Sequence, residues 1–324
     1  MKVFKMGRLN NKCVFLCCGC LGFIGSHFIE KVLALGHKVI NFDSETYAAN
    51  LGMTFQGDYH YVKCDIATID SLPFCDIIVN FAAESHVDNS IANASNFINT
   101  NVMGVHNLLE LIKRNKIQNM LVNWSYSPPL FIQISTDEVF GDILSGYFSE
   151  GDRHLPSNPY SATKSCAEML VHAWGRTYGI PYIITRTTNN YGKRQHAEKL
   201  IPATITKLLN NQKVIVHGDG RYIRNWIHVN DNVSAILKII DLSDVNSVYH
   251  ISSDEEYSVK EIVTMIAENM NVKYDDIIDT SSDRSGCDER YALDCSKLKS
   301  LGWTQQFHLK DELPNLIKFF KDRQ

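Results

Sequence analysis

An apolar run, a glycine-rich turn and a helical pattern follow one another near the start of the chain. Cys13–Cys18 (CVFLCC) is continuously apolar, as expected for a central parallel strand. Gly19, Gly22 and Gly25 come next, and helical spacing continues from about Ile24 to Leu35. The glycines permit a tight turn and a close approach of backbone to a pyrophosphate, and the helix N-terminus offers free N–H groups. This order limits the fold more than any other feature, because it predicts a dinucleotide-binding βαβ unit.

A carboxylate after the second predicted strand indicates which dinucleotide would bind. Lys38–Phe42 (KVINF) is that strand, and Asp43 follows it directly. An acid at this place holds the adenosine ribose hydroxyls, and its charge would repel a 2′-phosphate. Asp43 is alternatively a turn residue, because Ser44, Glu45 and Thr46 also suit a turn. Its position after the glycine-rich turn favours the cofactor role, so the sequence predicts NAD rather than NADP.

Strands and helices alternate along the first part of the chain. Apolar runs predict further strands, and helical spacing predicts two long helices; the strands are Tyr59–Lys63, Asp76–Phe81, Leu130–Ile134 and Pro181–Arg186, and the helices are Ala94–Arg114 and Tyr160–Tyr178. Repeated alternation is typical of a doubly wound parallel sheet. The predicted fold class is α/β, a Rossmann-type sheet with a smaller, partly interleaved C-terminal α/β substrate domain.

The alternation becomes less regular after Arg186. Helices are predicted at Ile201–Asn210, Asp231–Ile240, Val259–Asn269 and Lys310–Lys321, with a strand near Lys213–His217 and a loop at Asn189–Gly192. The resulting division is a short disordered leader over residues 1–12, a Rossmann domain over 13–188 and a second domain over 189–324, some of whose segments return to the first.

Two acids and a hydroxyl come directly after one predicted strand. Thr136, Asp137 and Glu138 follow the apolar run Leu130–Ile134 and Ser135, so they lie at the carboxyl end of that strand. Open α/β sheets bind their ligands at this edge. An acidic pair after a strand is more often a loop or a helix cap than a catalytic site, so this stretch alone decides nothing.

A second stretch supplies a Tyr and a Lys that lie close together. Tyr160 and Lys164 begin a helical pattern and are four residues apart, which places them on one helix face. A Tyr with a pKa near ~10 is a poor base at neutral pH, and a neighbouring ammonium lowers that pKa. Such a pair is common by chance. Its occurrence together with the acidic stretch, downstream of the glycine-rich turn, favours a site for more than one proton transfer.

Composition excludes several other classes of function. The chain has 324 residues, 44% of them hydrophobic, and a formal net charge of −4 from well mixed charges, so no basic footprint for nucleic acid is present. No apolar run is long enough to span a membrane. Of nine cysteines, four crowd at Cys13, Cys17, Cys18 and Cys20. Adjacent strand residues point to opposite faces, so these thiols are predicted to be buried and not metal ligands, in a reducing, cytoplasmic protein.

Several longer motifs resemble one family over nearly the whole chain. The motifs are Gly22-Phe23-Ile24-Gly25-Ser26-His27, Ala82-Ala83-Glu84-Ser85-His86-Val87-Asp88, Ser135-Thr136-Asp137-Glu138-Val139, Pro159-Tyr160-Ser161-Ala162-Thr163-Lys164 and Arg290-Tyr291-Ala292-Leu293-Asp294. The chain resembles an extended short-chain dehydrogenase/reductase of the nucleoside-diphosphate-glucose 4,6-dehydratase type, as in dTDP-glucose 4,6-dehydratase. The Thr-Asp-Glu triplet distinguishes dehydratases from other members of the superfamily, because related 4-epimerases lack the acid pair and related decarboxylases usually have Ser in place of Asp137.

The resemblance implies an activity and a role for each catalytic residue. NAD⁺ would oxidise the sugar at C4, water would leave from C5 and C6, and the hydride would return to C6. Tyr160, helped by Lys164, would take the 4-hydroxyl proton while Thr136 bonds the same oxygen. Glu138 would remove the C5 proton, and Asp137 in its acid form would protonate the leaving hydroxyl. The product, a 4-keto-6-deoxy sugar, belongs to deoxysugar biosynthesis of the rhamnose type.

The resemblance also implies binding residues and an assembly. NAD would contact Gly19, Gly22, Phe23, Ile24, Gly25, Asp43, Ser44, Thr46, Asp65, Ile66, Ala82, Ala83, Ser85, Thr100, Tyr160 and Lys164. The nucleotide sugar would contact Ser85, His86, Asp88, Thr136, Asn189, Arg224, Asn230 and Arg290. Members of the family are commonly homodimers through two Rossmann-domain helices, here about Ala94–Arg114 and Tyr160–Tyr178.

Departures from the family pattern leave alternatives open. Cys18-Gly19-Cys20-Leu21 replaces a usual Thr-Gly-Gly-Ala, Asn89 stands where Arg is usual, and Asn225 stands where Asp is usual. The choice between dTDP and UDP is therefore open. A 4-epimerase or decarboxylase of the same fold is the nearest alternative, and a catalytically silent NAD-binding protein is the alternative from another class.

Overall fold

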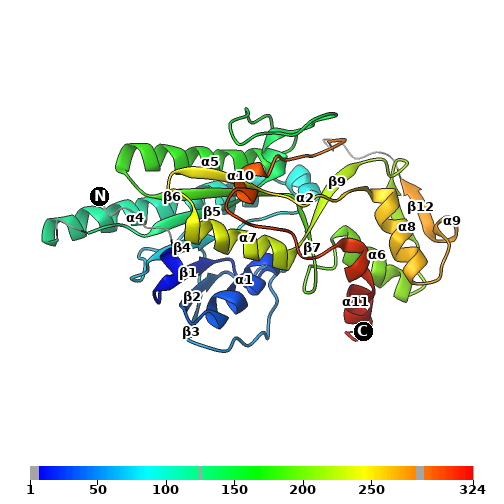
Figure 1. Ribbon diagram of the computed structural model, residues 1–324, viewed down its shortest axis with the longest axis horizontal. Coiled ribbons are helices and arrows are strands. Elements are labelled where there is room, and N and C mark those ends of the chain that lie inside the picture. Colours follow the sequence, from blue (N-terminus) through cyan, green and yellow to red (C-terminus); the bar gives the residue numbers. More distant parts are fainter. Residues whose placement is uncertain (1–6, 124–125, 282–287, 324) are drawn as a thin grey trace.

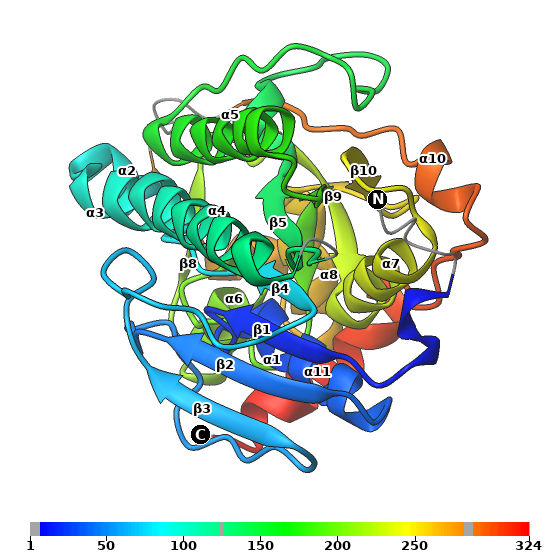
Figure 2. The ribbon, with the colours of Figure 1, turned by 90° about the vertical axis from the view of Figure 1, so that its left-hand side faces the viewer.

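A parallel seven-stranded sheet forms the centre of the computed structural model, which describes residues 7–123, 126–281 and 288–323 (Figures 1 and 2). The strand order is β10-β6-β5-β4-β1-β2-β3, and each pair of neighbours is parallel. The strands are β1 (Val14–Cys18), β2 (Lys38–Asp43), β3 (Tyr59–Lys63), β4 (Ile77–Asn80), β5 (Leu130–Thr136), β6 (Tyr182–Thr187) and β10 (Ser247–Ile251). The predicted Rossmann-type α/β fold class is confirmed.

The strand order reverses direction at β1, which pairs with β2 on one side and with β4 on the other. A crevice opens at such a point beyond the carboxyl ends of the strands, and open α/β sheets bind ligands there. Gly19 follows β1 and Ala82 lies just beyond β4, so both border this crevice. The glycine-rich turn is thereby placed where a dinucleotide would need it.

Helices cover both faces of the sheet, and β1 shows how the sequence divides its side chains between them. Phe15 and Cys17 join a core with α1 (Phe23–Ala34) and α7 (Val229–Leu242). Leu16 and Cys18 face the other way, into a core with α4 (Val105–Val122) and α5 (Pro159–Tyr178). Because both faces are covered, a parallel strand must be apolar at successive positions, as β1 is.

The clustered cysteines belong to these cores. Cys13, Cys17, Cys18 and Cys20 are all buried, as the sequence predicts, and burial raises the pKa of the Cys18 and Cys20 thiols. Among the described residues, no three His, Cys, Asp or Glu side chains are grouped to hold a metal ion. No helix in the described ranges is long and apolar enough to cross a membrane.

The helix predicted at Ala94–Arg114 differs in detail. After α2 (Val87–Ala92), a short α3 (Ser95–Phe97) leads into a π-helical segment, Ile98–Gly104, and only then into α4. The side chain of Asn101 in this segment accepts from Glu84 N and donates to Glu84 O and to the Thr163 hydroxyl. These bonds hold the wider turn against β4 and α5, and π-helical turns of this kind often lie at functional sites.

The second lobe has its own core and two small sheets. Strands β7 (Asn189–Tyr191), β9 (Ile223–His228) and β11 (Glu256–Ser258) form one sheet, and β8 (Val214–His217) pairs with β12 (Ile278–Ser281). The lobe's helices are α6 (Leu200–Leu209), α8 (Val259–Asn269), α9 (Tyr274–Ile277) and α11 (Leu309–Lys321), and α10 (Ser296–Lys299) contacts β10 instead. Asn189–Tyr191 was expected in a loop but pairs with β9. The chain also returns to the first domain through α7 and β10.

Residues 7–12 are ordered, whereas the sequence predicts a disordered leader over residues 1–12. A 3₁₀ turn spans Arg8–Asn10, and the Arg8 guanidinium donates to the carbonyls of Ile240 and Ser243 at 2.5 Å. These acceptors lie at the C-terminal end of α7, where carbonyls lack helical partners and a cation is favoured. Residues 1–6 lie outside the described part.

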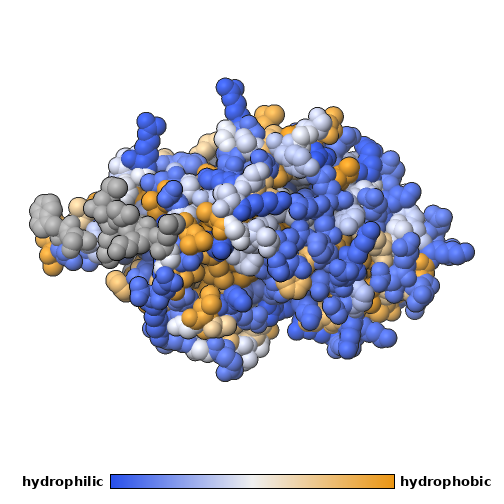
Figure 3. All heavy atoms as spheres, viewed as in Figure 1, coloured by the Kyte–Doolittle hydropathy of each residue, from blue (hydrophilic) through white to orange (hydrophobic). Residues whose placement is uncertain are grey.

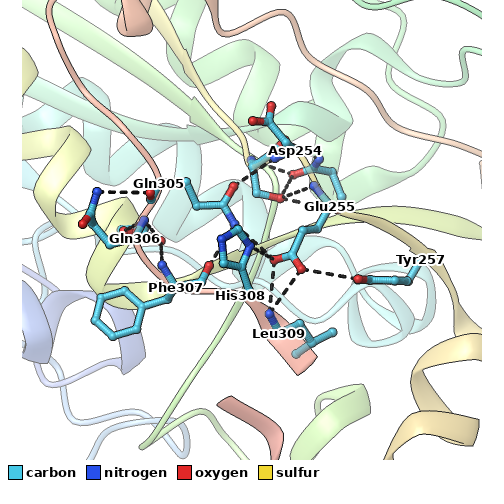
Figure 4. Close-up of polar contacts among 11 residues, drawn as sticks. Asp254, Glu255, Tyr257, Gln305, Gln306, Phe307, His308 and Leu309 are labelled. Atoms are coloured by element: carbon cyan, nitrogen blue, oxygen red, sulfur yellow. Dashed lines mark hydrogen bonds and ion pairs between the residues drawn. The ribbon is translucent and has the colours of Figure 1, made fainter. Parts of the chain in front are cut away.

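A carboxylate fastens the start of α11 to the second lobe. Polar groups of Gln305, His308 and Leu309 lie toward Glu255 (Figure 4). The carboxylate accepts from Leu309 N at 3.2 Å, from Gln305 Nε2 at 3.1 Å and from the Tyr257 hydroxyl at 3.3 Å. His308, at the N-cap position, provides no side-chain cap of its own. Glu255 therefore supplies the acceptor and the negative charge that a helix N-terminus favours.

Glu255→Gln is expected to lower the free energy of unfolding by about 1–2 kcal/mol, because a neutral amide replaces the charged acceptor. Urea unfolding followed by circular dichroism measures this change. Asp254→Asn is the matched control, since Asp254 is exposed and pairs only at the surface with Lys299; its change should stay under about 0.5 kcal/mol. Equal losses in both variants would contradict the capping role of Glu255.

Candidate active site

The N-terminus of α5 is fixed by its own sequence, and this fixes Tyr160. Asn158 caps the helix by accepting from Ser161 N at 3.0 Å, and the Ser161 hydroxyl bonds back to Asn158 N. Pro159 occupies the first turn, where its missing N–H costs nothing. Lys164 follows one turn later and donates from Nζ to the carbonyl of Ile134 at 2.6 Å. The helix thus meets the end of β5 with both side chains inward.

The acidic stretch leaves β5 in a short 3₁₀ helix, Asp137–Phe140, which places its side chains beside α5. The Thr136 hydroxyl accepts from Glu138 N at 3.3 Å and donates to Asp137 Oδ1 at 3.1 Å. Asn158 donates from Nδ2 to Glu138 Oε2 at 3.4 Å. The cap of α5 therefore touches one of the two acids, and the hydroxyl orients the other.

One cavity of about 330 Å³ collects nearly all of these groups. Its lining includes all five residues predicted to be catalytic, namely Thr136, Asp137, Glu138, Tyr160 and Lys164. It also includes every residue predicted to contact NAD, among them Gly19, Asp43, Ser85 and Thr100. Residues from the carboxyl ends of six sheet strands thus meet around one space, which makes it the candidate active site.

The glycine-rich turn fits a dinucleotide on structural grounds. Gly19 has φ +72°, and a Cβ there would lie 2.4 Å from Ala82 Cα, so only glycine fits. A Cβ on Gly25 would lie 2.6 Å from Cys20 Cα. Gly22 caps α1 without a side chain, which leaves the first N–H groups of the helix directed at the cavity. Asp43 lines the far end, its carboxylate accepting from Leu21 N and Glu45 N at 2.8 Å.

The two acids have pKa values that the site raises. Burial, and then the charge of Glu138, raises the pKa of Asp137 to about 7. Burial also raises the pKa of Glu138, while Arg224 and the Asn158 amide oppose the rise. Oδ2 of Asp137 is buried without a hydrogen-bond partner, as suits a carboxyl group that carries a proton. Two adjacent carboxyl groups with raised pKa values can supply one acid and one base near neutral pH.

The pKa of Tyr160 is raised, whereas the sequence predicts that Lys164 lowers it. Burial is the main cause, Glu138 and Asp137 add to it, and the Thr136 hydroxyl opposes it. Burial lowers the pKa of Lys164 to about 8, so its amine is less fully protonated near neutral pH than that of an exposed lysine. The neutral phenol is therefore favoured in this site, and additional positive charge, such as that of bound NAD⁺ beside the Lys164 ammonium, would favour the phenolate that can accept a proton.

The residues predicted to bind the sugar nucleotide are more dispersed. Ser85, Thr136 and Asn189 line the cavity, whereas His86, Asp88, Arg224, Asn230 and Arg290 do not. Arg224 lies over the Tyr291 ring and bonds the carbonyl of Asp288. Arg290 forms a forked pair with Glu256 and bonds the carbonyl of Gly146. In this arrangement Arg290 holds a neighbouring loop.

Sequence reasoning missed a polar segment between β7 and α6. His196, Glu198 and Lys199 line the cavity, and Lys199 Nζ donates to Ser85 O at 3.3 Å. Glu198 lies within 3.9 Å of His86 and 3.6 Å of His196. The run of charged residues just before a predicted helix was the available signal. The Lys199 ammonium, 3.7 Å from Glu198, supplies a cation to the cavity, as suits a phosphate group of a ligand.

Comparison with known proteins identifies the family. Residues 16–315 match the family model described as GDP-mannose 4,6 dehydratase. The chain belongs to this family.

Relatives of this dehydratase-family chain match it over most of their length. The Agl12 protein of Haloferax volcanii, described as a low-salt glycan biosynthesis protein, is 40% identical over 93% of this chain and 96% of its own. A dTDP-glucose 4,6-dehydratase of Haemophilus influenzae is 37% identical over 92% of this chain and 95% of its own. The crystal structure of DesIV, a dTDP-glucose 4,6-dehydratase of Streptomyces venezuelae with NAD bound, superposes with a TM-score of 0.88 at 34% identity, covering 95% and 97% of the two chains.

Proposed function

We propose that the protein is an NAD-dependent 4,6-dehydratase of a nucleoside-diphosphate glucose. The observation that carries this proposal is the meeting of Asp137 and Glu138 with Tyr160 and Lys164 around the cavity that the glycine-rich turn borders. An oxidation needs the Tyr and Lys, and an elimination needs a separate acid and base. Relatives at 37% and 34% identity named dTDP-glucose 4,6-dehydratase support the same activity.

The reaction follows from the chemistry of a glucose ring, whose C5 proton becomes acidic only beside a ketone at C4. Tyr160 accepts the proton of the 4-hydroxyl, and Thr136 bonds the same oxygen. Bound NAD⁺ supplies a hydride acceptor for C4 and, once reduced, a hydride donor for C6. Glu138 accepts the C5 proton, and Asp137 donates a proton to the departing C6 hydroxyl, which leaves as water. When the hydride returns to C6, the protonated Glu138 gives a proton back to C5, after exchange with solvent. One water is lost, and the cofactor ends in its original oxidation state.

The substrate's nucleotide is proposed to be dTDP or UDP, and NAD is favoured over NADP. Asp43 lines the cofactor end of the cavity with its carboxylate already holding two backbone N–H groups, a place unfavourable for a 2′-phosphate. The product, a 4-keto-6-deoxy sugar, fits deoxysugar biosynthesis of the rhamnose type. A cytoplasmic location stays a prediction from the sequence.

Mass spectrometry of the products made in deuterated water tests the function. Purified protein is given NAD⁺ and either dTDP-glucose or UDP-glucose. Loss of one water with one solvent deuterium gained at C5 is the expected result, and the faster substrate names the nucleotide. Epimerisation without a mass change would favour the 4-epimerase alternative. Persistent NAD binding with no change in either sugar would favour the catalytically silent alternative.

We also propose that the protein is a homodimer through the helices that carry the site. The segment Ile98–Val122 and α5 lie side by side, and Trp174 Nε1 donates to Glu110 at 2.8 Å between them (Figure 2). Both expose large apolar side chains, including Met103 at 48% and Met169 at 58%. Hydrophilic residues cover most of the face drawn in Figure 3, and the apolar side chains that stay exposed on these two segments favour an interface.

Met169→Glu is expected to convert the dimer into a monomer, because a charge would be buried between the subunits. Sedimentation velocity at micromolar concentration measures the mass of the species. Ile215→Glu on β8 is the control, since Ile215 is 52% exposed and lies in the second lobe. A monomer in the unaltered protein, or dissociation by Ile215→Glu alone, would contradict the proposed interface.

A further inference from the structure

A buried ion pair lies directly behind the catalytic ends of β5 and α5. Glu168 of α5 is 0% exposed and Arg186 of β6 is 2% exposed. The guanidinium donates to the carboxylate from Nε at 3.1 Å and from Nη2 at 2.8 Å. A forked pair of this kind fixes the orientation of the carboxylate as well as its charge. Neither residue lines the cavity, so the pair is outside the machinery described above.

Glu168 is connected to the catalytic residues in two ways. The hydroxyl of Ser135 donates to Glu168 Oε1 at 2.5 Å, and Ser135 immediately precedes Thr136 on β5. Lys164 precedes Glu168 by four residues on α5, so the two side chains lie on one face, one turn apart. The same carboxylate thus holds the strand that presents Thr136 and lies near the ammonium that accompanies Tyr160.

We propose that Glu168 is a positioning residue for the oxidation step, holding Thr136 in place through Ser135 and setting a negative charge one helix turn from Lys164. The catalytic consequence rests on the proposed dehydratase function. The effect on the Lys164 ammonium does not, because it depends only on charges within the folded protein.

The groups that face Glu168 come from several elements. Arg186 binds it, His154 of the loop before α5 lies 3.7 Å away, and His172 follows on α5. His250 of β10 lies 3.3 Å from Arg186 Nη1, and His154 lies 2.8 Å from Nη2. Burial lowers the pKa of all three histidines, so they are neutral at pH 7. The arginine therefore compensates Glu168, and the histidines add no rival positive charge.

The same network shows why the charge matters to Lys164. Burial lowers the pKa of the Lys164 ammonium to about 8, and the Glu168 carboxylate opposes this fall. Without the carboxylate the pKa falls further, and the guanidinium of Arg186 becomes an uncompensated cation nearby. Lys164 would then lose its proton closer to neutral pH. Tyr160 would lose the cation beside it at the pH where the enzyme works.

Glu168→Gln tests the electrostatic part, because it keeps the size of the side chain and removes its charge. Protein labelled with ¹³Cε-lysine is titrated by NMR, and the Lys164 signal is assigned by its absence in Lys164→Met. The apparent pKa of Lys164 is expected to fall by about one pH unit or more. The alkaline limb of kcat should move to lower pH as well, since the ammonium is the active form and is lost as pH rises through its pKa. Glu168→Asp, which keeps the charge, should restore both.

A Lys164 signal that titrates unchanged in folded Glu168→Gln protein would overturn the proposal. Loss of fold alone cannot mimic the expected result, because an altered stability moves the unfolding transition and leaves the titration of Lys164 in the folded state where it was. If the unaltered protein turns over neither sugar, the proposed function fails, and the NMR titration still decides the role of Glu168.

Ser135→Ala tests the positioning part and leaves the ion pair in place. It removes only the hydroxyl that links β5 to Glu168, so the protein is expected to fold even if Glu168→Gln does not. A fall in kcat of roughly tenfold is expected, with KM and the Lys164 titration unchanged, because Thr136 shifts and the charges do not. Unaltered kcat in this variant would overturn the link through Ser135.

Discussion

Glu138→Gln is expected to lower turnover by about 10²–10⁴-fold while NAD still binds and the first oxidation still occurs. The amide has nearly the size of the carboxylate and can accept the hydrogen bond that Asn158 donates to Glu138 Oε2 at 3.4 Å. It has no useful basicity, so the C5 proton of the 4-keto intermediate has no acceptor. The reaction should stop after hydride transfer.

Two measurements separate this outcome from a general loss of activity. The near-ultraviolet absorbance of NADH should rise and persist when Glu138→Gln meets its sugar nucleotide. Exchange of the C5 proton in deuterated water, followed by NMR, should fall with turnover. Glu138→Asp is the matched control, because it keeps a carboxylate one methylene further away and should recover part of the rate. Undiminished C5 exchange in Glu138→Gln would refute the role of Glu138 as the base.

The substitution should also change the neighbouring acid. The charge of Glu138 is the second cause, after burial, of the raised pKa of Asp137, which is about 7. Removing that charge lowers the pKa of Asp137 and so reduces its protonated fraction near neutral pH. The two acids are therefore not interchangeable. Each depends on the other for the protonation state that its own step needs.

The parts of the site that local sequence predicts well are those set by a single element. The glycine-rich turn at Gly19 is predicted by the order of a strand, a turn and a helix in the sequence. The structure adds the reason for glycine, because a Cβ at this position would clash with Ala82. Tyr160 and Lys164 follow from helical spacing. Strand β5 is predicted by its apolar run, because a parallel strand covered on both faces needs apolar side chains at successive positions.

The parts that sequence did not predict depend on contacts between distant elements. Arg290 was expected at the nucleotide, but its guanidinium pairs with Glu256, which lies 34 residues away in the chain. The strand β10 joins the first sheet beside β6, although it follows much of the second lobe. The raised pKa of Tyr160 reflects burial and the nearby acids, which its spacing from Lys164 does not show. Local patterns carry no information on such packing.

Tyr160→Phe is expected to lower the rate of the first oxidation by about 10²–10⁴-fold. The substitution removes the phenolic oxygen alone and keeps the ring, which packs edge-on against Phe97 with centroids 6.4 Å apart. Lys164 and the glycine-rich turn remain, so NAD binding should persist. Because the 4-hydroxyl then has no proton acceptor, hydride transfer to NAD⁺ fails, and none of the later steps can begin.

A single-turnover experiment distinguishes this variant from Glu138→Gln. NADH absorbance should stay flat after Tyr160→Phe is mixed with the sugar nucleotide, whereas it should accumulate in Glu138→Gln. Tyr274→Phe is the control, because Tyr274 lies on α9 in the second lobe and lines no part of the cavity. Normal NADH formation in Tyr160→Phe would assign the base to another group. Burial raises the pKa of Tyr160, and the positive charge of bound NAD⁺ would favour the phenolate beside the Lys164 ammonium. Without the phenolic oxygen the first proton transfer has no acceptor, so the reaction is expected to stop there.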